Sequence, residues 1–226
     1  MQTVSTPQLQ LETLFVLDDR MRIVRTREPD ARRGPLFVLI RSATSCAWAV
    51  RSDVSASLFG RLEQLAREEP PVADLRAEPL HADAYRLLLG GQVQFGPAFE
   101  FPRLIPAGDP VQQIASEDVL EAHFHGWRRG EIGAGRGPVM AVMAGGRPVS
   151  ICFCARRSAF AAEAGIETAE AYRARGFATR VTAAWALAIR ASGLVPLYST
   201  SWHNDASLAV ARKLRLIPYA SDWSIV

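Results

Sequence analysis

The chain has 226 residues, of which 49% are hydrophobic and 22% charged, a balance typical of a globular protein with a buried core. No apolar run approaches the roughly 18–20 residues that cross a bilayer, and the first residues lack a basic segment followed by an apolar one. We therefore expect no membrane association and no secretion signal. The net charge is +3, but the basic residues, all arginine except Lys213, are scattered among acids. The sequence therefore lacks the basic runs typical of nucleic-acid-binding proteins, and we expect no nucleic-acid partner.

The three cysteines favour a reducing compartment. Cys152 and Cys154 flank a single residue of a predicted strand, which holds their Cα atoms near the upper limit for a disulfide. There is no Cys-x-x-Cys pair and no Cys/His cluster with zinc spacing, so the sequence predicts no metal site. We expect a cytoplasmic protein.

The first third of the chain predicts strands followed by helices. Residues 1–10 show no clear pattern and are expected to form a frayed end. Residues 11–29 predict a hairpin with its turn at Asp18 and Asp19, and residues 35–50 predict a second strand pair around a Ser/Thr turn.

Two helices and a break in composition follow. Residues 55–70 predict a helix with Ser55 as N-cap, and residues 81–91 predict a shorter helix that ends at a glycine pair. The Pro/Gly-rich segment 95–110 then marks a domain boundary. We expect an N-terminal α+β lobe over residues 1–105 and a second domain over residues 106–226.

The second domain predicts a helix over residues 116–127, capped by Ser116. The elements expected after it are two strands around a Gly-Gly turn (135–157), a strand (159–168), a helix (177–192), a strand (195–202), a helix (204–214) and a closing strand (217–226). This order favours a mixed α+β fold in which helices pack on a mostly antiparallel sheet with one parallel crossover.

The crossover passes through the turn 172–180, at the amino end of the predicted long helix. The first amide N–H groups of a helix lack intrahelical partners, and the helix dipole adds positive charge, so such an end binds anions. Gly176 removes a side chain from the approach, and Arg175 and Arg180 add charge at the rim. These residues equally fit an ordinary turn with solvated arginines. The turn lacks the glycine pattern of dinucleotide sites and the Lys-Ser/Thr pair of a P-loop.

Arg173-Ala174-Arg175-Gly176-Phe177-Ala178 resembles the R/Q-x-x-G-x-G/A motif of the GNAT acyltransferase superfamily. Further on, the segment 202–214 (WHNDASLAVARKL) resembles the second motif of that superfamily. The resemblance covers roughly residues 111–226. Thr168, just before the motif, is most similar to the glycine N-acyltransferase-like branch. The resemblance implies the acyl-CoA N-acyltransferase fold, with one splayed parallel strand pair.

The resemblance also implies a binding site for acetyl-CoA, with no metal. The strand edge Ile166, Glu167 and Thr168 would pair with the pantetheine arm, and Asn204 and Ser207 would contact the same arm. The motif would hold the pyrophosphate through Arg173, Arg175, Gly176, Phe177, Ala178, Thr179 and Arg180.

The catalytic groups depart from the family pattern. The usual tyrosine of the last helix is replaced by Ala211. Tyr198, Tyr172 or Tyr219 could substitute for it as the acid, or the thiolate could leave without one, because a thiol is a tolerable leaving group. Candidate bases are His203, which titrates in the useful range, and the carboxylates Glu167 and Glu163. Our catalytic candidates are His203, Glu167 and Tyr198, although for each carboxylate the sequence favours a solvated or paired side chain over a catalytic role.

The N-terminal lobe carries no motif. It fits a degenerate copy of the same fold or a separate α+β module, and in either case it would wall the acceptor site or form a homodimer interface. The resemblance implies an acyl-CoA-dependent N-acyltransferase that acts on a small-molecule or protein amine. The alternatives are a non-catalytic coenzyme A-binding regulatory module and, less favoured, a scaffold without ligand.

Overall fold

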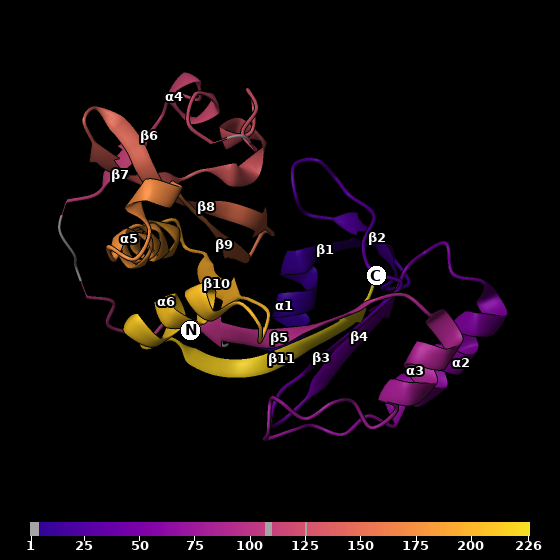
Figure 1. The fold of residues 1–226 in the computed structure, drawn as a ribbon. Helices are drawn as coiled ribbons and strands as arrows, with labels where there is room; N and C mark the ends of the chain where they lie inside the picture. The colour runs from indigo at the N-terminus through magenta and orange to yellow at the C-terminus, as the bar shows by residue number, and fades with distance from the viewer. Residues whose placement is uncertain (1–4, 107–109, 125) are drawn as a thin grey trace.

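A computed structural model describes residues 5–106, 110–124 and 126–226. Over these residues, one nine-stranded sheet runs through the whole molecule (Figure 1). Its strand order is β4 (Cys46–Val50), β3 (Phe37–Arg41), β11 (Ile217–Ile225), β5 (Val93–Glu100), β10 (Val195–Ser199), β9 (Ala161–Thr168), β8 (Arg147–Arg157), β7 (Val139–Ala144) and β6 (Gln112–Ile114). The mixed α+β class predicted from the sequence is confirmed.

Strands β9 and β10 form the predicted parallel pair, and the other ladders of this sheet are antiparallel. The parallel pairing of β9 with β10 ends at Leu197↔Glu163. Beyond that point β10 pairs only with β5, on its other side, through Tyr198 and Ser199. The two strands therefore diverge, and the β9 edge from residue 164 to residue 168 has no strand partner on that side within the described chain.

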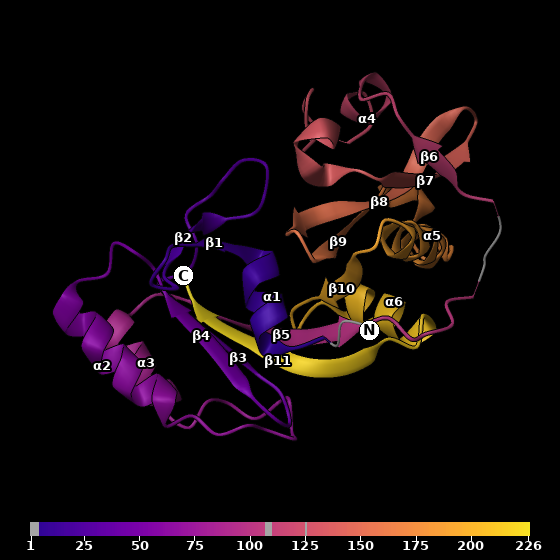
Figure 2. The same cartoon turned by 180° about the vertical axis from the view of Figure 1, so that it is seen from behind.

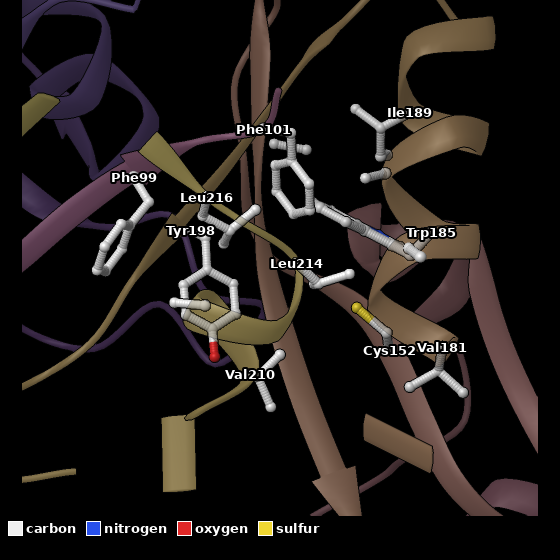
Figure 3. Packing of buried hydrophobic residues seen from close by; sticks show 14 of the residues in the cluster. Phe99, Phe101, Cys152, Val181, Trp185, Ile189, Tyr198, Val210, Leu214 and Leu216 are labelled. Atoms are coloured by element: carbon white, nitrogen blue, oxygen red, sulfur yellow. The ribbon is translucent and has the colours of Figure 1, made fainter. Parts of the chain in front are cut away.

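Helices cover both faces at the C-terminal end of the sheet. Helices α5 (Phe177–Ala191) and α6 (Asp205–Lys213) pack on one face around Trp185, which is fully buried beside Phe101 with ring centroids 6.3 Å apart (Figure 3). Truncating such a buried aromatic to alanine costs about 3–5 kcal/mol. The opposite face is covered by α4 (Asp118–Glu121) and the irregular helical turn η1 (Ile132–Arg136).

The other end of the sheet carries the N-terminal elements (Figure 2). Helices α2 (Ala56–Arg67) and α3 (Ala82–Leu89) cover one face and bury Trp223 of β11. Helix α1 (Pro7–Leu14) and the hairpin of β1 (Phe15–Leu17) and β2 (Ile23–Thr26) lie on the other face. Helix α1 also contacts β8 and β9, so it joins the two ends of the molecule.

The frayed end predicted over residues 1–10 is wrong from Pro7 onwards, because helix α1 begins there. Thr6 caps this helix by accepting a hydrogen bond from the Leu9 amide at 3.1 Å, and Pro7 fits the first helical turn. Leu11 and Leu14 are buried against the sheet. Tertiary burial rather than local pattern stabilises so short a helix.

The helix predicted over residues 116–127 is also wrong in extent, since only the single turn α4 forms and residue 125 lies outside the described residues. Ser116 is not its cap. Glu117 stands at that position and accepts hydrogen bonds from the amides of Gly130 at 2.5 Å and Ile132 at 2.7 Å. The carboxylate thus fastens the chain that leads into η1. Strand β6, just before α4, was not predicted.

The segment 95–110, predicted as a domain boundary, begins inside strand β5, and residues 107–109 lie outside the described residues. Strand β5 lies in the middle of the sheet, between β11 and β10. A Cβ at Gly96 would be 1.7 Å from the Thr200 carbonyl oxygen, so glycine lets the chain after β10 cross β5 closely. The division at residue 105 stays a prediction. The hairpin predicted over residues 11–29 forms from Phe15 onwards, but its first residues are wrong because they belong to helix α1. The remaining predicted helices and strands are confirmed: 35–50, 55–70, 81–91, 135–157, 159–168, 177–192, 195–202, 204–214 and 217–226.

Candidate functional site

The turn between β9 and α5 forms a backbone cradle at the helix amino end. After the helical turn η2 (Glu170–Tyr172), Ala174 and Gly176 both take left-handed conformations, with φ of 61° and 80°. Alternating conformations of this kind turn successive N–H groups towards one side. Gly176 is the N-cap of α5 and, within the described chain, no side chain caps the helix. The first-turn amides therefore have no capping side chain among the described residues, and the space beside Gly176 is open, since a Cβ there would meet nothing within 4 Å.

Arginines line the rim of this cradle. The Arg175 guanidinium lies 5.0 Å from the Tyr172 ring centroid, and that of Arg180 lies 5.5 Å from the Phe177 ring. Arg180 also donates to the Pro110 carbonyl at 3.3 Å, and Arg173 donates to the Thr168 carbonyl at 3.4 Å. These contacts hold positive charge beside the helix end, where the dipole also favours an anion.

The free edge of β9 leads from the cradle towards the divergence from β10. Ile166 points to the α5 face and packs against its core, whereas Glu167 points to the α4 face, where a Cβ on Gly126 would lie 3.9 Å from its Oε1. Thr168 is held by a 2.8 Å hydrogen bond between its hydroxyl and that of Ser150. The edge thus offers unpaired backbone groups to an extended ligand.

The second motif residue, Asn204, is the N-cap of α6. Its Oδ1 accepts a hydrogen bond from the Ser207 amide at 3.0 Å, which fixes the side chain and leaves its NH2 group without a partner in the described part of the chain. The Tyr198 hydroxyl lies 2.5 Å from Ser207 Oγ and donates to the Ser207 carbonyl at 3.1 Å. Burial raises the pKa of Tyr198 to about 12, although the Ser207 hydrogen bond opposes the rise. The phenol therefore stays protonated at neutral pH.

The two other catalytic candidates lie in different surroundings. Glu167 is half-buried, and burial raises its pKa, an effect that Arg136 opposes and Glu131 strengthens. His203 is exposed in the turn between β10 and α6, where its amide donates to Ser201 Oγ at 3.2 Å. The structure thus places Glu167 and Tyr198 on opposite faces of the sheet, and the roles of all three residues stay predictions.

A buried polar cluster beneath α1 was not predicted as a unit. Glu163, 3% exposed, accepts hydrogen bonds from Arg156 Nη1 at 2.7 Å and from Ser199 Oγ. We call this group the α1-face cluster; its members are Gln10, Arg156, Glu163, Ser199, Tyr219 and Asp222. Ser199 lies two residues past the last parallel pair, so the cluster borders the point where β9 and β10 diverge.

One carboxylate of this cluster, that of Asp222, is unfavourable in its charged form. Burial raises the pKa of Asp222 to about 7, with a further rise from Glu163 and an opposing effect of Arg156. Asp222 and Glu163 come from strands far apart in the sequence. The Arg156–Glu163 neighbourhood across the β8–β9 hairpin is the one signal that sequence reasoning could have used, since the two residues are register partners.

Two cavities of about 270 and 600 Å³ lie elsewhere, and neither is lined by residues of the cradle. In the described part of the chain, no three His, Cys, Asp or Glu side chains are grouped to hold a metal ion. Across the same residues, no helix combines the length and the apolar surface that a membrane span requires.

A family model described as GNAT acetyltransferase matches residues 108–217. A structure from Novosphingobium aromaticivorans DSM 12444, assigned as a GNAT family acetyltransferase, is 22% identical with a TM-score of 0.50 over 59% of this chain. This chain covers 64% of that structure, less than two thirds of its length. A GCN5-related N-acetyltransferase-like protein from Streptococcus suis 89/1591 is 17% identical with a TM-score of 0.50 over 85% of each chain.

A conserved protein of unknown function from Staphylococcus epidermidis ATCC 12228 aligns over 98% of this chain and 96% of its own. It is 10% identical, with a TM-score of 0.55. Comparison with curated protein sequences finds no match. At these identities the solved structures establish a shared fold, and the match to the family model concerns the half of the chain that contains the cradle.

Proposed function

The chain belongs, through residues 108–217, to the GNAT acetyltransferases, and from this premise we propose that it transfers an acetyl group from acetyl-CoA to an amine. The family and the fold support acyl-CoA-dependent N-acetyltransferase activity. The observation that carries the finer proposal is the open backbone cradle at the amino end of α5, next to the diverging strands β9 and β10.

The cradle fits the diphosphate of coenzyme A. A charged diphosphate needs donors that are already in place, and helix-end amides supply them without loss of side-chain entropy. The left-handed residues Ala174 and Gly176 shape this turn, the space beside Gly176 is open, and the rim arginines add charge. The residues that would hold this group are Arg173, Arg175, Gly176, Phe177, Ala178, Thr179 and Arg180.

The pantetheine arm would follow the free edge of β9. Backbone groups of Ile166, Glu167 and Thr168 can pair with its amides as a neighbouring strand would. The NH2 group of Asn204, held in place by the cap of α6, can donate to a carbonyl of the same arm, and Ser207 lies beside it. A ligand laid along this edge runs from the cradle to the strand divergence.

When bound, acetyl-CoA supplies an activated acyl carbon that the acceptor amine attacks directly, without a covalent enzyme intermediate. Glu167, half-buried with a raised pKa, would take the amine proton, directly or through water. Tyr198, kept protonated and hydrogen-bonded to Ser207, would give a proton to the leaving sulfur in place of the tyrosine that Ala211 replaces. His203 stays a second candidate base. Cytoplasmic location and homodimer formation stay predictions.

Ligand binding and turnover test this proposal separately. Saturating acetyl-CoA should raise the melting temperature, because a ligand that binds the native state stabilises it. Thiol release over a panel of amines should then show steady turnover. Absence of a thermal shift would contradict the donor site, whereas binding without turnover on any amine would support the coenzyme A-binding module instead.

Glu167→Gln tests the assignment of the base. A base acts when ionised, so activity should fall as the pH drops through the Glu167 pKa, which burial places above its ordinary 4.5. Loss of a general base lowers kcat by about 100-fold or more, and the acid limb of the pH profile should disappear with it. Glu63→Gln, on helix α2, is the matched control. An unchanged profile in Glu167→Gln would move the role to His203.

A further inference from the structure

A cavity of about 270 Å³ lies between the chain after β2, the turn η1 and the end of β8. Its polar wall is formed by three arginines, Arg27, Arg156 and Arg157, together with Ser158. The cavity therefore combines a small volume with three guanidinium groups, of which only that of Arg156 forms ion pairs within the described residues. Proteins use guanidinium groups in such settings to bind carboxylate or phosphate groups.

Two of these arginines keep donors for a ligand. Arg27 uses its Nε to donate to the carbonyls of Glu12 at 2.7 Å and Phe15 at 3.0 Å. Arg157 uses Nη1 to donate to the Gly137 carbonyl at 3.2 Å. Across the described residues neither forms an ion pair, and burial, followed by Arg25, lowers the pKa of Arg27. Glu12 opposes this lowering, and a bound anion would oppose it further.

The third arginine connects the cavity to the strand divergence. Arg156 forms ion pairs with Glu163 at 2.7 Å and Glu28 at 2.5 Å, and Glu163 in turn accepts a hydrogen bond from Ser199 of β10. The Nε of Arg156 is buried and has no hydrogen-bond partner in the described part of the chain. Buried donors are almost always satisfied, so an orphan beside a cavity points to a ligand acceptor there.

The cavity surrounds the end of β8 and is lined from both faces of the sheet, because Arg156 pairs in register with Glu163 whereas Arg157 pairs with Ala162, which faces α5. Glu163 and Glu167 point to the same face of β9, because strand residues four apart share a face. Residues of η1 line the cavity and pack on that face of the sheet. Arg156, on the cavity wall, and Glu163 are register partners, so the backbone at Arg156 lies one strand spacing, about 5 Å, from the point where β9 parts from β10. This is the reach of a small bifunctional molecule.

We infer that the acceptor is a small amine that carries a carboxylate, with the carboxylate bound by Arg27 and Arg157 in this cavity and the amine directed to the strand divergence. The inference rests on the proposed function. A carboxylate suits the planar guanidinium fork, and the volume admits a small molecule rather than a folded protein. Because the two sites are separated, acceptors whose amine and carboxylate are several bonds apart are favoured over glycine.

A ladder of ω-amino acids, from glycine to 6-aminohexanoate, tests this assignment with the full chain and acetyl-CoA. Each acid is paired with its amide and with the plain alkylamine of the same length, and thiol release gives kcat/KM. We expect each longer acid to exceed its amide by about tenfold, the effect of one charge-assisted hydrogen bond. Equal rates for acid and amide would overturn the inference. Taurine and 2-aminoethylphosphonate form a further arm, and preference for either over 3-aminopropionate would overturn the choice of carboxylate.

Variants then locate the effect. Arg157→Gln and Arg27→Gln should each lower the acid-to-amide preference about tenfold, whereas Arg147→Gln, at the exposed start of the same strand β8, should leave the preference unchanged. An unchanged preference in both cavity variants would overturn the location. Unaltered melting temperatures and acetyl-CoA binding would show that the variants are folded.

Binding provides a readout that does not depend on turnover. Titration calorimetry of 6-aminohexanoate into the protein saturated with coenzyme A should show binding that weakens about tenfold in Arg157→Gln. Absence of binding to a protein that still takes up coenzyme A would overturn the acceptor inference alone. Failure of coenzyme A itself to bind would instead contradict the proposed function.

Discussion

The cradle at the start of α5 and the α1-face cluster lie near the same strand divergence, but the first consists of backbone groups and the second of side chains. The cradle uses backbone groups of consecutive residues, shaped by the left-handed Ala174 and Gly176. The cluster uses side chains from α1, β8, β9, β10 and β11. Backbone donors occupy fixed positions whatever the neighbouring side chains are. The charges of the cluster instead depend on one another for their pairing.

Removing one charge from the cluster should give the largest effect on stability. Arg156→Gln leaves Glu163 and Glu28 without their ion-pair partner, and an uncompensated buried carboxylate costs about 3–5 kcal/mol. The free energy of unfolding from urea denaturation measures the loss. Arg147→Gln, on the same strand but exposed, should change it by less than about 0.5 kcal/mol. Equal stability of the two variants would mean that the cluster does not depend on its pairing.

A charge placed in the cradle should abolish donor binding with little effect on the cluster. Gly176→Asp sets a carboxylate against the proposed diphosphate and should weaken acetyl-CoA binding by about 100-fold or more, which calorimetry can measure. Gly176→Ala is the control: its Cβ meets open space, so the left-handed backbone costs about 1 kcal/mol of stability while affinity largely persists. Wild-type affinity in Gly176→Asp would place the diphosphate elsewhere.

Strand β5, which lies between β11 and β10 in the middle of the sheet, can be tested at its closest contact. Gly96→Ala would place a Cβ against the Thr200 carbonyl and should destabilise the fold by about 2 kcal/mol, within the range for overpacking. Gly60→Ala is a matched glycine substitution within α2, where the added Cβ has open space. It should instead stabilise the fold by about 0.5–1 kcal/mol through helix propensity. Destabilisation by both, measured by thermal unfolding, would remove the role given to the β5 crossing.

The same contrast explains what the sequence could predict. The cradle, the crossover and the capping Asn204 lie within short segments whose glycine, arginine and cap residues have local physical reasons to be there, so the pattern predicts them. Helices α5 and α6 likewise show their apolar periodicity directly. Local patterns of this kind can be recognised in a single sequence, because they do not depend on contacts with distant residues.

The elements that were missed are those that only tertiary contacts create. Helix α1 has little periodicity of its own and forms because Leu11 and Leu14 are buried against the sheet. Strand β5 lies in a Pro/Gly-rich segment that suggests a linker, yet it pairs with strands from the end of the chain. The arginine cavity joins residues about 130 positions apart, as in the Arg156–Glu28 contact. No local pattern connects such residues.

The smallest expected effect is a pH dependence of the free energy of unfolding that arises from the cluster and not from the cradle. The folded state raises the pKa of Asp222 from 3.8 to about 7, so between these values it binds a proton that the unfolded chain has lost. Stability therefore falls as the pH rises through this window. Asp222→Asn should remove that fall and be more stable than wild type above pH 7 by on the order of 1 kcal/mol, with the difference vanishing near pH 4. Unfolding free energies measured across this range decide the point. Curves for variant and wild type that stay parallel would show that Asp222 titrates normally, and the electrostatic strain assigned to the α1-face cluster would then be absent.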